Sequence, residues 1–109
     1  MATTYKVLGQ SNPSATTATT LYTVPSATQA VVSTIVIANL AASAATFRIA
    51  VRVAGATLAN SQYVAYDITV GASDSTALTL GLTLGAADVI TIYASTANIT
   101  FTAFGSEIA

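Results

Sequence analysis

Two arginines carry the most distinctive chemistry of this sequence, which holds only 3 basic residues in 109. Arg48 and Arg52 are predicted on one face of the alternating segment Thr46–Val53, about 13 Å apart at the usual rise of a strand. That separation is too large for both guanidinium groups to bind one small anion. We expect each to pair with a carboxylate, such as Asp67 or Glu107, or to contact a partner chain across an interface.

Acid–base and nucleophilic catalysis would have few participants in this chain. Histidine and cysteine are both absent, so no serine has an evident base and no thiolate is available. Three of the four carboxylates stand in or beside turns, where Asp commonly caps its own backbone. Asp74 and Asp88 could at most contribute to a calcium site, without the spacing of an EF-hand. We therefore predict no catalytic residues, no metal site and no cofactor, in a protein that is not an enzyme.

Tyrosine is the most frequent aromatic residue, with five copies. The five tyrosines could in principle form a platform on which a sugar ring stacks, namely Tyr5, Tyr22, Tyr63, Tyr66 and Tyr93, and two of them, Tyr63 and Tyr93, are predicted on outward faces of strands. Aromatic residues on strands also pack across to neighbouring strands, and that interpretation stays open beside the first. Tyr63 and Tyr93 join Arg48 and Arg52 as candidate interface residues.

The composition excludes several classes of partner. A net charge of -1 without a basic cluster argues against nucleic acid. No apolar window reaches the roughly 18 residues of a membrane-spanning helix, so we expect no membrane partner. The N-terminal residues lack the apolar core of a secretory signal, and we expect no export by that route. With 6% charged residues, the surface is predicted to be partly covered by copies of the chain or by a larger assembly, the alternative being a small threonine-coated monomer.

The elements that position these residues are predicted from alternation with a period of two. In Thr46–Val53, we expect four apolar side chains to face the core, namely Phe47, Ile49, Val51 and Val53. The run Ala30–Leu40 is largely apolar on both sides, which is typical of a central strand. Leu78–Leu84 places leucine at every second position, and Gly81 indicates a bulge or bend within it.

Further strands are predicted at Tyr5–Leu8, Thr19–Val24, Gln62–Val70, Val89–Ala94 and Ile99–Phe104. About eight short strands separated by Gly, Asn, Asp and Pro turns indicate an all-β fold with a single antiparallel β-sandwich domain over residues 1–109. Its topology is expected to be a jelly roll or immunoglobulin-like. The short termini, Met1–Thr4 and Ser106–Ala109, are expected to extend from the sandwich, with at least one reaching a neighbour.

Three segments together resemble a group of small tailed-bacteriophage proteins, often from phages of cyanobacteria and other aquatic bacteria: Leu21–Pro25 (LYTVP), Thr46–Val51 (TFRIAV) and Phe104–Ile108 (FGSEI). The resemblance covers nearly the whole chain, although its motifs are packing and turn patterns. It implies a non-enzymatic virion protein, assembled in the host cytoplasm, that decorates the capsid or joins the tail apparatus.

From the resemblance and the low charge together, we expect the chain to self-associate as a homotrimer or other cyclic oligomer, and to bind phage capsid or tail proteins. The alternative function is a carbohydrate-binding or adhesin-like module at the host-facing surface of the virion.

Overall fold

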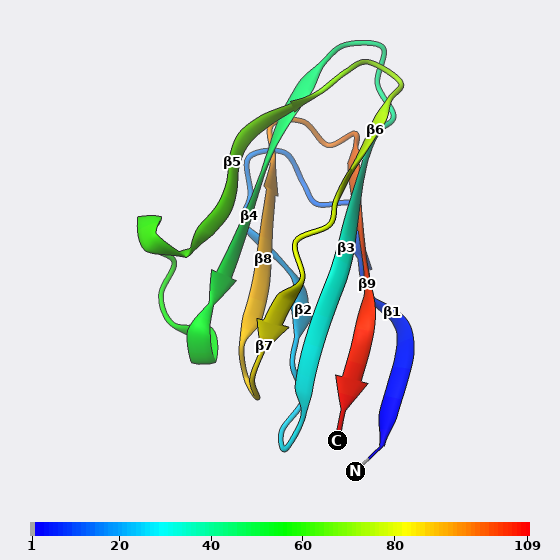
Figure 1. Ribbon diagram of the computed structural model, residues 1–109. Helices are drawn as coiled ribbons and strands as arrows, with labels where there is room; N and C mark the ends of the chain where they lie inside the picture. Colours follow the sequence, from blue (N-terminus) through cyan, green and yellow to red (C-terminus); the bar gives the residue numbers. More distant parts are fainter. Residues whose placement is uncertain (1) are drawn as a thin grey trace.

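The computed structural model describes residues 2–109, which form two antiparallel sheets packed face to face (Figure 1). The first sheet has the order β1-β9-β3-β6, and β7 also pairs with β3. Its strands are β1 (Thr3–Ser11), β3 (Gln29–Asn39), β6 (Ser75–Leu78), β7 (Leu82–Leu84) and β9 (Ile99–Ile108). The second sheet has the order β2-β8-β4-β5. Its strands are β2 (Thr19–Thr23), β4 (Ala45–Arg52), β5 (Tyr63–Val70) and β8 (Val89–Ala94).

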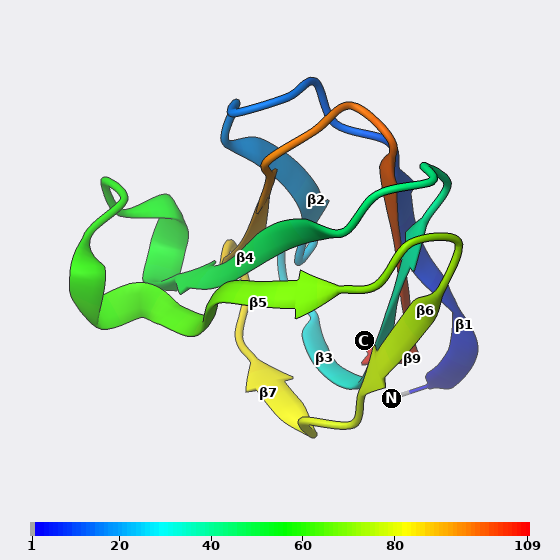
Figure 2. The same ribbon diagram turned by 90° about the horizontal axis from the view of Figure 1, so that it is seen from above.

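The path of the chain between the sheets identifies a jelly roll. The strands β1 to β4 alternate between the first sheet and the second, and β8 and β9 again lie in different sheets. An immunoglobulin-like domain would instead keep its first two strands in one sheet. Counting β6 and β7 as one broken strand gives the eight strands of a jelly roll, whose two layers are visible from above in Figure 2.

The leucine-rich run Leu78–Leu84 is two strands rather than the single one predicted. It leaves the sheet between Leu78 and Leu82, where Gly81 adopts a φ of 62°. That left-handed conformation costs glycine little, and it produces the bend expected there. Both pieces pair with β3, so β3 lies inside its sheet as predicted.

The apolar core lies between the sheets and is anchored by Phe47 of β4 and Phe101 of β9. Their rings meet edge to face with centroids 6.1 Å apart. Phe47 and Ile49 are fully buried, as predicted, and Val51 is half-buried against the core. The prediction for Val53 was wrong, because β4 ends at Arg52 and the chain turns into a short 3-10 turn, η1 (Val53–Gly55). Val53 is therefore 68% exposed.

A bulge in β3 changes which side chains face the core. Ala30 and Val32 are buried before the bulge, and Ile35 and Ile37 are buried after it. The register shifts between Val32 and Thr34, so Ser33 is the extra residue that reverses the alternation. The prediction of one uninterrupted alternation along this strand was wrong for that reason.

Both described ends of the chain lie in the first sheet rather than extending from the sandwich. β1 begins at Thr3, β9 continues to Ile108, and Ala2 and Ala109 exchange two backbone hydrogen bonds of 2.9 and 3.0 Å. The two ends are adjacent in Figure 1. The expectation of extended termini was therefore wrong for residues 2–4 and 106–109, and Met1 lies outside the described residues.

Candidate interaction surfaces

A bulge in β5 aims two side chains at Arg48. Phe47 pairs with Ile68 and Ile49 pairs with Ala65, so Tyr66 and Asp67 together stand opposite Arg48. Asp67 has a φ of 50°, the left-handed conformation that lets a strand accommodate an extra residue. An uninterrupted strand would place consecutive side chains on opposite faces. The bulge instead brings an aromatic ring and a carboxylate to the same guanidinium group.

Arg48 is held by that carboxylate and by two rings. Its Nε donates to Asp67 Oδ1 at 2.7 Å and its Nη2 donates to Asp67 Oδ2 at 3.3 Å. Its guanidinium carbon lies 4.2 Å from the ring centroid of Tyr66 and 4.3 Å from that of Tyr93. The hydrogen bond that Arg48 donates to Asp67 raises the pKa of Arg48 above its ordinary value. Arg48 thus pairs with a carboxylate as predicted, and the pair is neutral as a unit.

A shallow hollow adjoins Arg48 on the outer face of the second sheet. Asn60, Tyr63 and Tyr66 line its volume of about 390 Å³. The rings of Tyr63 and Tyr66 are edge to face, with centroids 4.9 Å apart, and Tyr66 is 55% exposed. Asn60 belongs to the 3-10 turn η2 (Asn60–Gln62) that precedes β5.

The structure therefore gathers three of the four predicted interface residues, namely Arg48, Tyr63 and Tyr93, around Tyr66, which sequence reasoning had named only among the five tyrosines of a possible sugar-stacking platform. Regular alternation over Gln62–Val70 would place Tyr66 on the face opposite Asp67, and only the bulge moves the two together.

Arg52 lies outside this group and binds the loop that follows β4. Its Nε donates to the carbonyl of Ala56 at 2.7 Å and its Nη2 donates to the carbonyl of Gly55 at 2.9 Å, with a longer contact of 3.4 Å to Thr91 Oγ1. Asp88 Oδ1 accepts from the backbone N–H of Ala54 at 2.8 Å. Arg52 therefore binds backbone carbonyls rather than a carboxylate, and it fixes the loop over residues 53–56, while its contact with a partner chain stays a prediction.

A second, apolar surface lies on the outer face of the first sheet. Tyr5 and Val7 of β1 and Phe104 of β9 are 84%, 46% and 39% exposed. Together with Lys6, Val31, Ser33, Gly105 and Ser106, they line an open groove of about 660 Å³. Exposed apolar side chains gathered in one groove are typical of a surface that contacts another molecule.

On the inner face of β1 and β9, Lys6 and Glu107 form an ion pair. Lys6 Nζ lies 2.8 Å from Glu107 Oε1, and the Tyr22 hydroxyl of β2 donates to Glu107 Oε2. The hydrogen bond from Lys6, and to a smaller extent the hydrogen bond from Tyr22, lower the pKa of Glu107 below its ordinary value. Burial, followed by the hydrogen bond to Glu107, raises the pKa of Tyr22.

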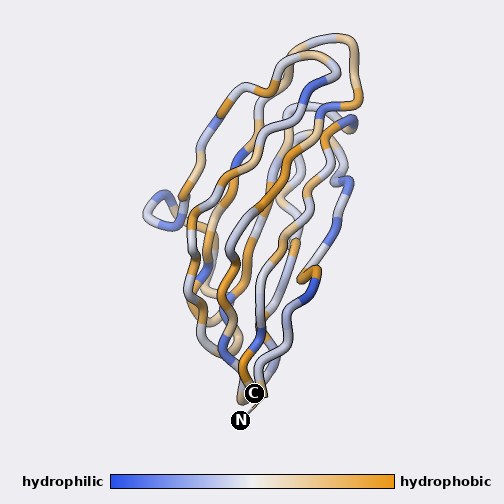
Figure 3. The backbone as a smooth tube through the Cα atoms, turned by 45° about the vertical axis from the view of Figure 1, so that its right-hand side comes forward, coloured by the Kyte–Doolittle hydropathy of each residue, from blue (hydrophilic) through white to orange (hydrophobic). Residues whose placement is uncertain are grey.

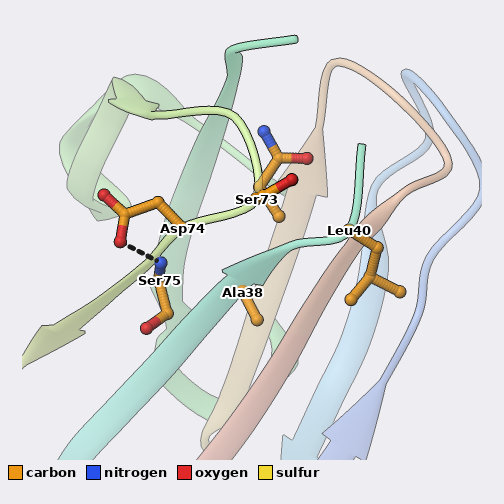
Figure 4. A pocket seen from close by; sticks show the side chains of 6 residues that line it. Ala38, Leu40, Ser73, Asp74 and Ser75 are labelled. Carbon is orange, nitrogen blue, oxygen red and sulfur yellow. Dashed lines mark hydrogen bonds between the residues drawn. The ribbon is translucent and has the colours of Figure 1, made fainter. Parts of the chain in front are cut away.

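The remaining carboxylates bind backbone N–H groups in their own turns. Asp74 Oδ1 accepts from the N–H of Ser75 at 2.8 Å, beside a hollow at the end of β3 (Figure 4). Asp88 Oδ2 accepts from Gly85 at 2.9 Å. The backbone of Asp74 bonds to Asn39 and that of Asp88 to Val24. The β5–β6 connection and the β7–β8 connection, which hold these two carboxylates, lie at opposite ends of the sandwich in Figure 1. Within residues 2–109, no group of three His, Cys, Asp or Glu side chains could hold a metal ion.

Every one of the 3 basic and 4 acidic side chains therefore has a polar partner within the described part of the chain. Strongly hydrophilic segments are scattered along the backbone in Figure 3 and do not gather on one face. Over residues 2–109 no helix is long and apolar enough to cross a membrane. Contacts made by this surface would rest on apolar burial and neutral hydrogen bonds rather than on net charge.

No protein-family model matches the chain, and no curated protein matches it either.

Proposed function

We propose that this protein is a non-enzymatic structural component of a bacteriophage virion, which self-associates and docks on the capsid or the tail apparatus. The observation that carries the proposal is the apolar groove of Tyr5, Val7 and Phe104 on a domain whose charged side chains all have internal partners. Such a surface associates through burial of apolar area, at about 25 cal/mol per Å². A weak contact of this kind becomes effective when many copies bind one particle.

Two further observations support this function. The TFRIAV motif covers most of the strand that holds Arg48, and the FGSEI motif covers the second half of the strand that holds Phe104. The jelly roll is also an architecture that viral capsid proteins and lectins use, although a fold alone does not determine a function.

The test is attachment to phage particles that lack the protein. Phe104→Lys places a charge in the groove, and we expect it to reduce co-sedimentation with the particles. Leu40→Lys is the matched control, because Leu40 is 67% exposed and belongs to a different surface, the hollow at the end of β3. Equal attachment of both variants would remove the groove from the interface. Failure of the unmodified protein to attach to any particle component would overturn the virion role.

A carbohydrate-binding module is the second candidate function, favoured by the hollow of Asn60, Tyr63 and Tyr66. Exposed tyrosine rings can stack on the apolar face of a sugar, and the amide of Asn60 offers both donors and acceptors for its hydroxyl groups. In a glycan array, Tyr66→Ala should then abolish binding while Tyr5→Ala preserves it. A monomer that binds a glycan tightly through Tyr66 would support this function against the first.

A further inference from the structure

One edge of β1 leaves a row of backbone groups without partners. Ala2 and Ala109 exchange both of their hydrogen bonds, so they form a hydrogen-bonded pair in the antiparallel ladder. Hydrogen-bonded and non-hydrogen-bonded pairs alternate along two antiparallel strands. The next residues of β1 whose backbone groups bond to β9 are therefore Thr4 and Lys6. The N–H and C=O groups of Thr3, Tyr5 and Val7 consequently point away from β9. Among residues 2–109, β1 pairs with β9 alone.

The open edge has a defined length. After Val7 the register shifts at a bulge, and Gly9 then approaches the backbone carbonyl of Leu21 so closely that a Cβ at Gly9 would clash with it. After Val7, β2 therefore covers the edge of β1 and leaves no space for another strand. The open edge is the segment Thr3–Val7.

This segment lacks the usual protections against pairing with another strand. Sheet edges are commonly blocked by proline, by bulges or by charged side chains. Thr3–Val7 contains no proline, and its register with β9 is regular. Its one charged residue, Lys6, is bound to Glu107 on the inner face. In the second sheet, by contrast, the edge strand β5 carries the bulge at Asp67.

We propose that two copies of the chain pair through these edges, antiparallel about a two-fold axis, with Tyr5 opposite Tyr5 of the second copy. This register uses all three unpaired residues, since Thr3 of each copy then lies opposite Val7 of the other. The two first sheets become one continuous sheet across the dimer. An isologous contact of this kind is the commonest way in which identical chains associate.

A second copy fits this edge better than a charged partner does. The side chains beside the edge are neutral, with Tyr5 84% exposed and Val7 46% exposed, and pairing would place a neighbouring strand beside both. The net charge of -1 and the internal ion pair at Lys6 leave little repulsion between two copies. Phe104 lies opposite Val7 in the ladder, so the dimer would extend the apolar groove across both copies.

This inference deepens the self-association within the proposed function, by naming the strand and the symmetry through which it occurs. The sequence has no cysteine, so single-cysteine variants of the full chain report contacts without interference. Tyr5→Cys should form a disulfide-linked dimer under mild oxidation, because residues in a hydrogen-bonded pair have Cα atoms about 5.5 Å apart, within disulfide range.

Thr4→Cys is the matched control. In the proposed register the two Thr4 residues are about 8 Å apart and point to the other face of the sheet, beyond disulfide range. We expect Tyr5→Cys to cross-link at least about tenfold faster than Thr4→Cys. Equal rates would indicate random collision and would overturn the proposed register.

A second variant tests the backbone pairing itself. Tyr5→Pro removes an N–H that points away from β9, a position where a sheet edge tolerates proline. The variant should sediment as a monomer at concentrations at which the unmodified chain is a dimer, and its melting temperature should match that of the unmodified chain diluted until it is monomeric. Thr4→Pro removes an N–H bonded to β9 and should lower the melting temperature. A Tyr5→Pro protein that remains dimeric would overturn the proposal, as would an unmodified chain that is monomeric at every concentration.

The particle assay separates this inference from the proposed function. An unmodified chain that sediments as a dimer and binds no phage particle would remove the virion role and leave the β1 pairing intact. An unmodified chain that attaches to particles and is monomeric at every concentration would do the reverse.

Discussion

Tyr22 of β2 donates a hydrogen bond to Glu107 of β9, so this pair of side chains links the two sheets of the sandwich. Lys6 binds the other oxygen of the same carboxylate. Glu107 therefore connects three strands, and only 14% of its side chain is exposed. The protonation state of this carboxylate should influence how firmly the sheets hold together.

The stability of the fold should decrease in acid through Glu107. The pKa of Glu107 is lowered in the folded chain from an ordinary value of 4.5. The unfolded chain then binds protons more readily, so the stabilising contribution is complete above pH 4.5 and is lost as the pH falls toward the lowered pKa. Melting curves between pH 2 and 7 should show a steeper loss below about pH 4.5 for the unmodified chain than for Glu107→Gln. Parallel curves would contradict the role of this carboxylate.

Ile49→Ala should destabilise the core. Ile49 is fully buried, and removing branched atoms from a packed core costs about 2 to 5 kcal/mol of unfolding free energy. Val53→Ala is the control, since Val53 is 68% exposed and should change the free energy by less than about 0.5 kcal/mol. Urea denaturation of both variants measures the difference. Similar midpoints would show that the burial assigned along β4 is wrong.

Gly105→Ala and Gly71→Ala should have opposite effects. A Cβ at Gly105 would clash with the backbone carbonyl of Val31, and a strand backbone has little freedom to move away, so we expect a loss of about 1 to 3 kcal/mol. A Cβ at Gly71 would have its closest contact at 3.6 Å, with Asp74. That change should be neutral or stabilising by up to about 1 kcal/mol, because alanine reduces the freedom of the unfolded chain. Thermal melting distinguishes the two outcomes.

Arg52→Ala should loosen one loop and leave the core folded. The guanidinium group of Arg52 binds the carbonyls of Gly55 and Ala56, so its loss frees residues 53–56. Amide hydrogen exchange should accelerate in this loop, while the amides of β8 keep their protection. Loss of protection throughout β8 would indicate that Arg52 supports the fold itself.

The sequence predicted the strands well because most of them alternate or carry strong turn residues at their ends. The run Val89–Ala94 and the central strand near Ala30–Leu40 were found in this way. The details that sequence reasoning missed are bulges, at Ser33 and at Asp67. A bulge reverses the alternation without any characteristic residue at the extra position. The local sequence therefore did not indicate that Tyr66 and Asp67 would both lie next to Arg48.

The strand order also has a consequence for the synthesis of this protein. Within the described chain, β1 pairs only with β9, which ends at Ile108. A ribosome delivers β1 before β9, so β1 has no sheet partner while the intervening residues are being made. The backbone groups of Thr4 and Lys6 that pair with β9 remain in water during that interval. The sandwich therefore closes after β9 has emerged, through long-range pairings that form slowly and leave the nascent chain open to aggregation until then.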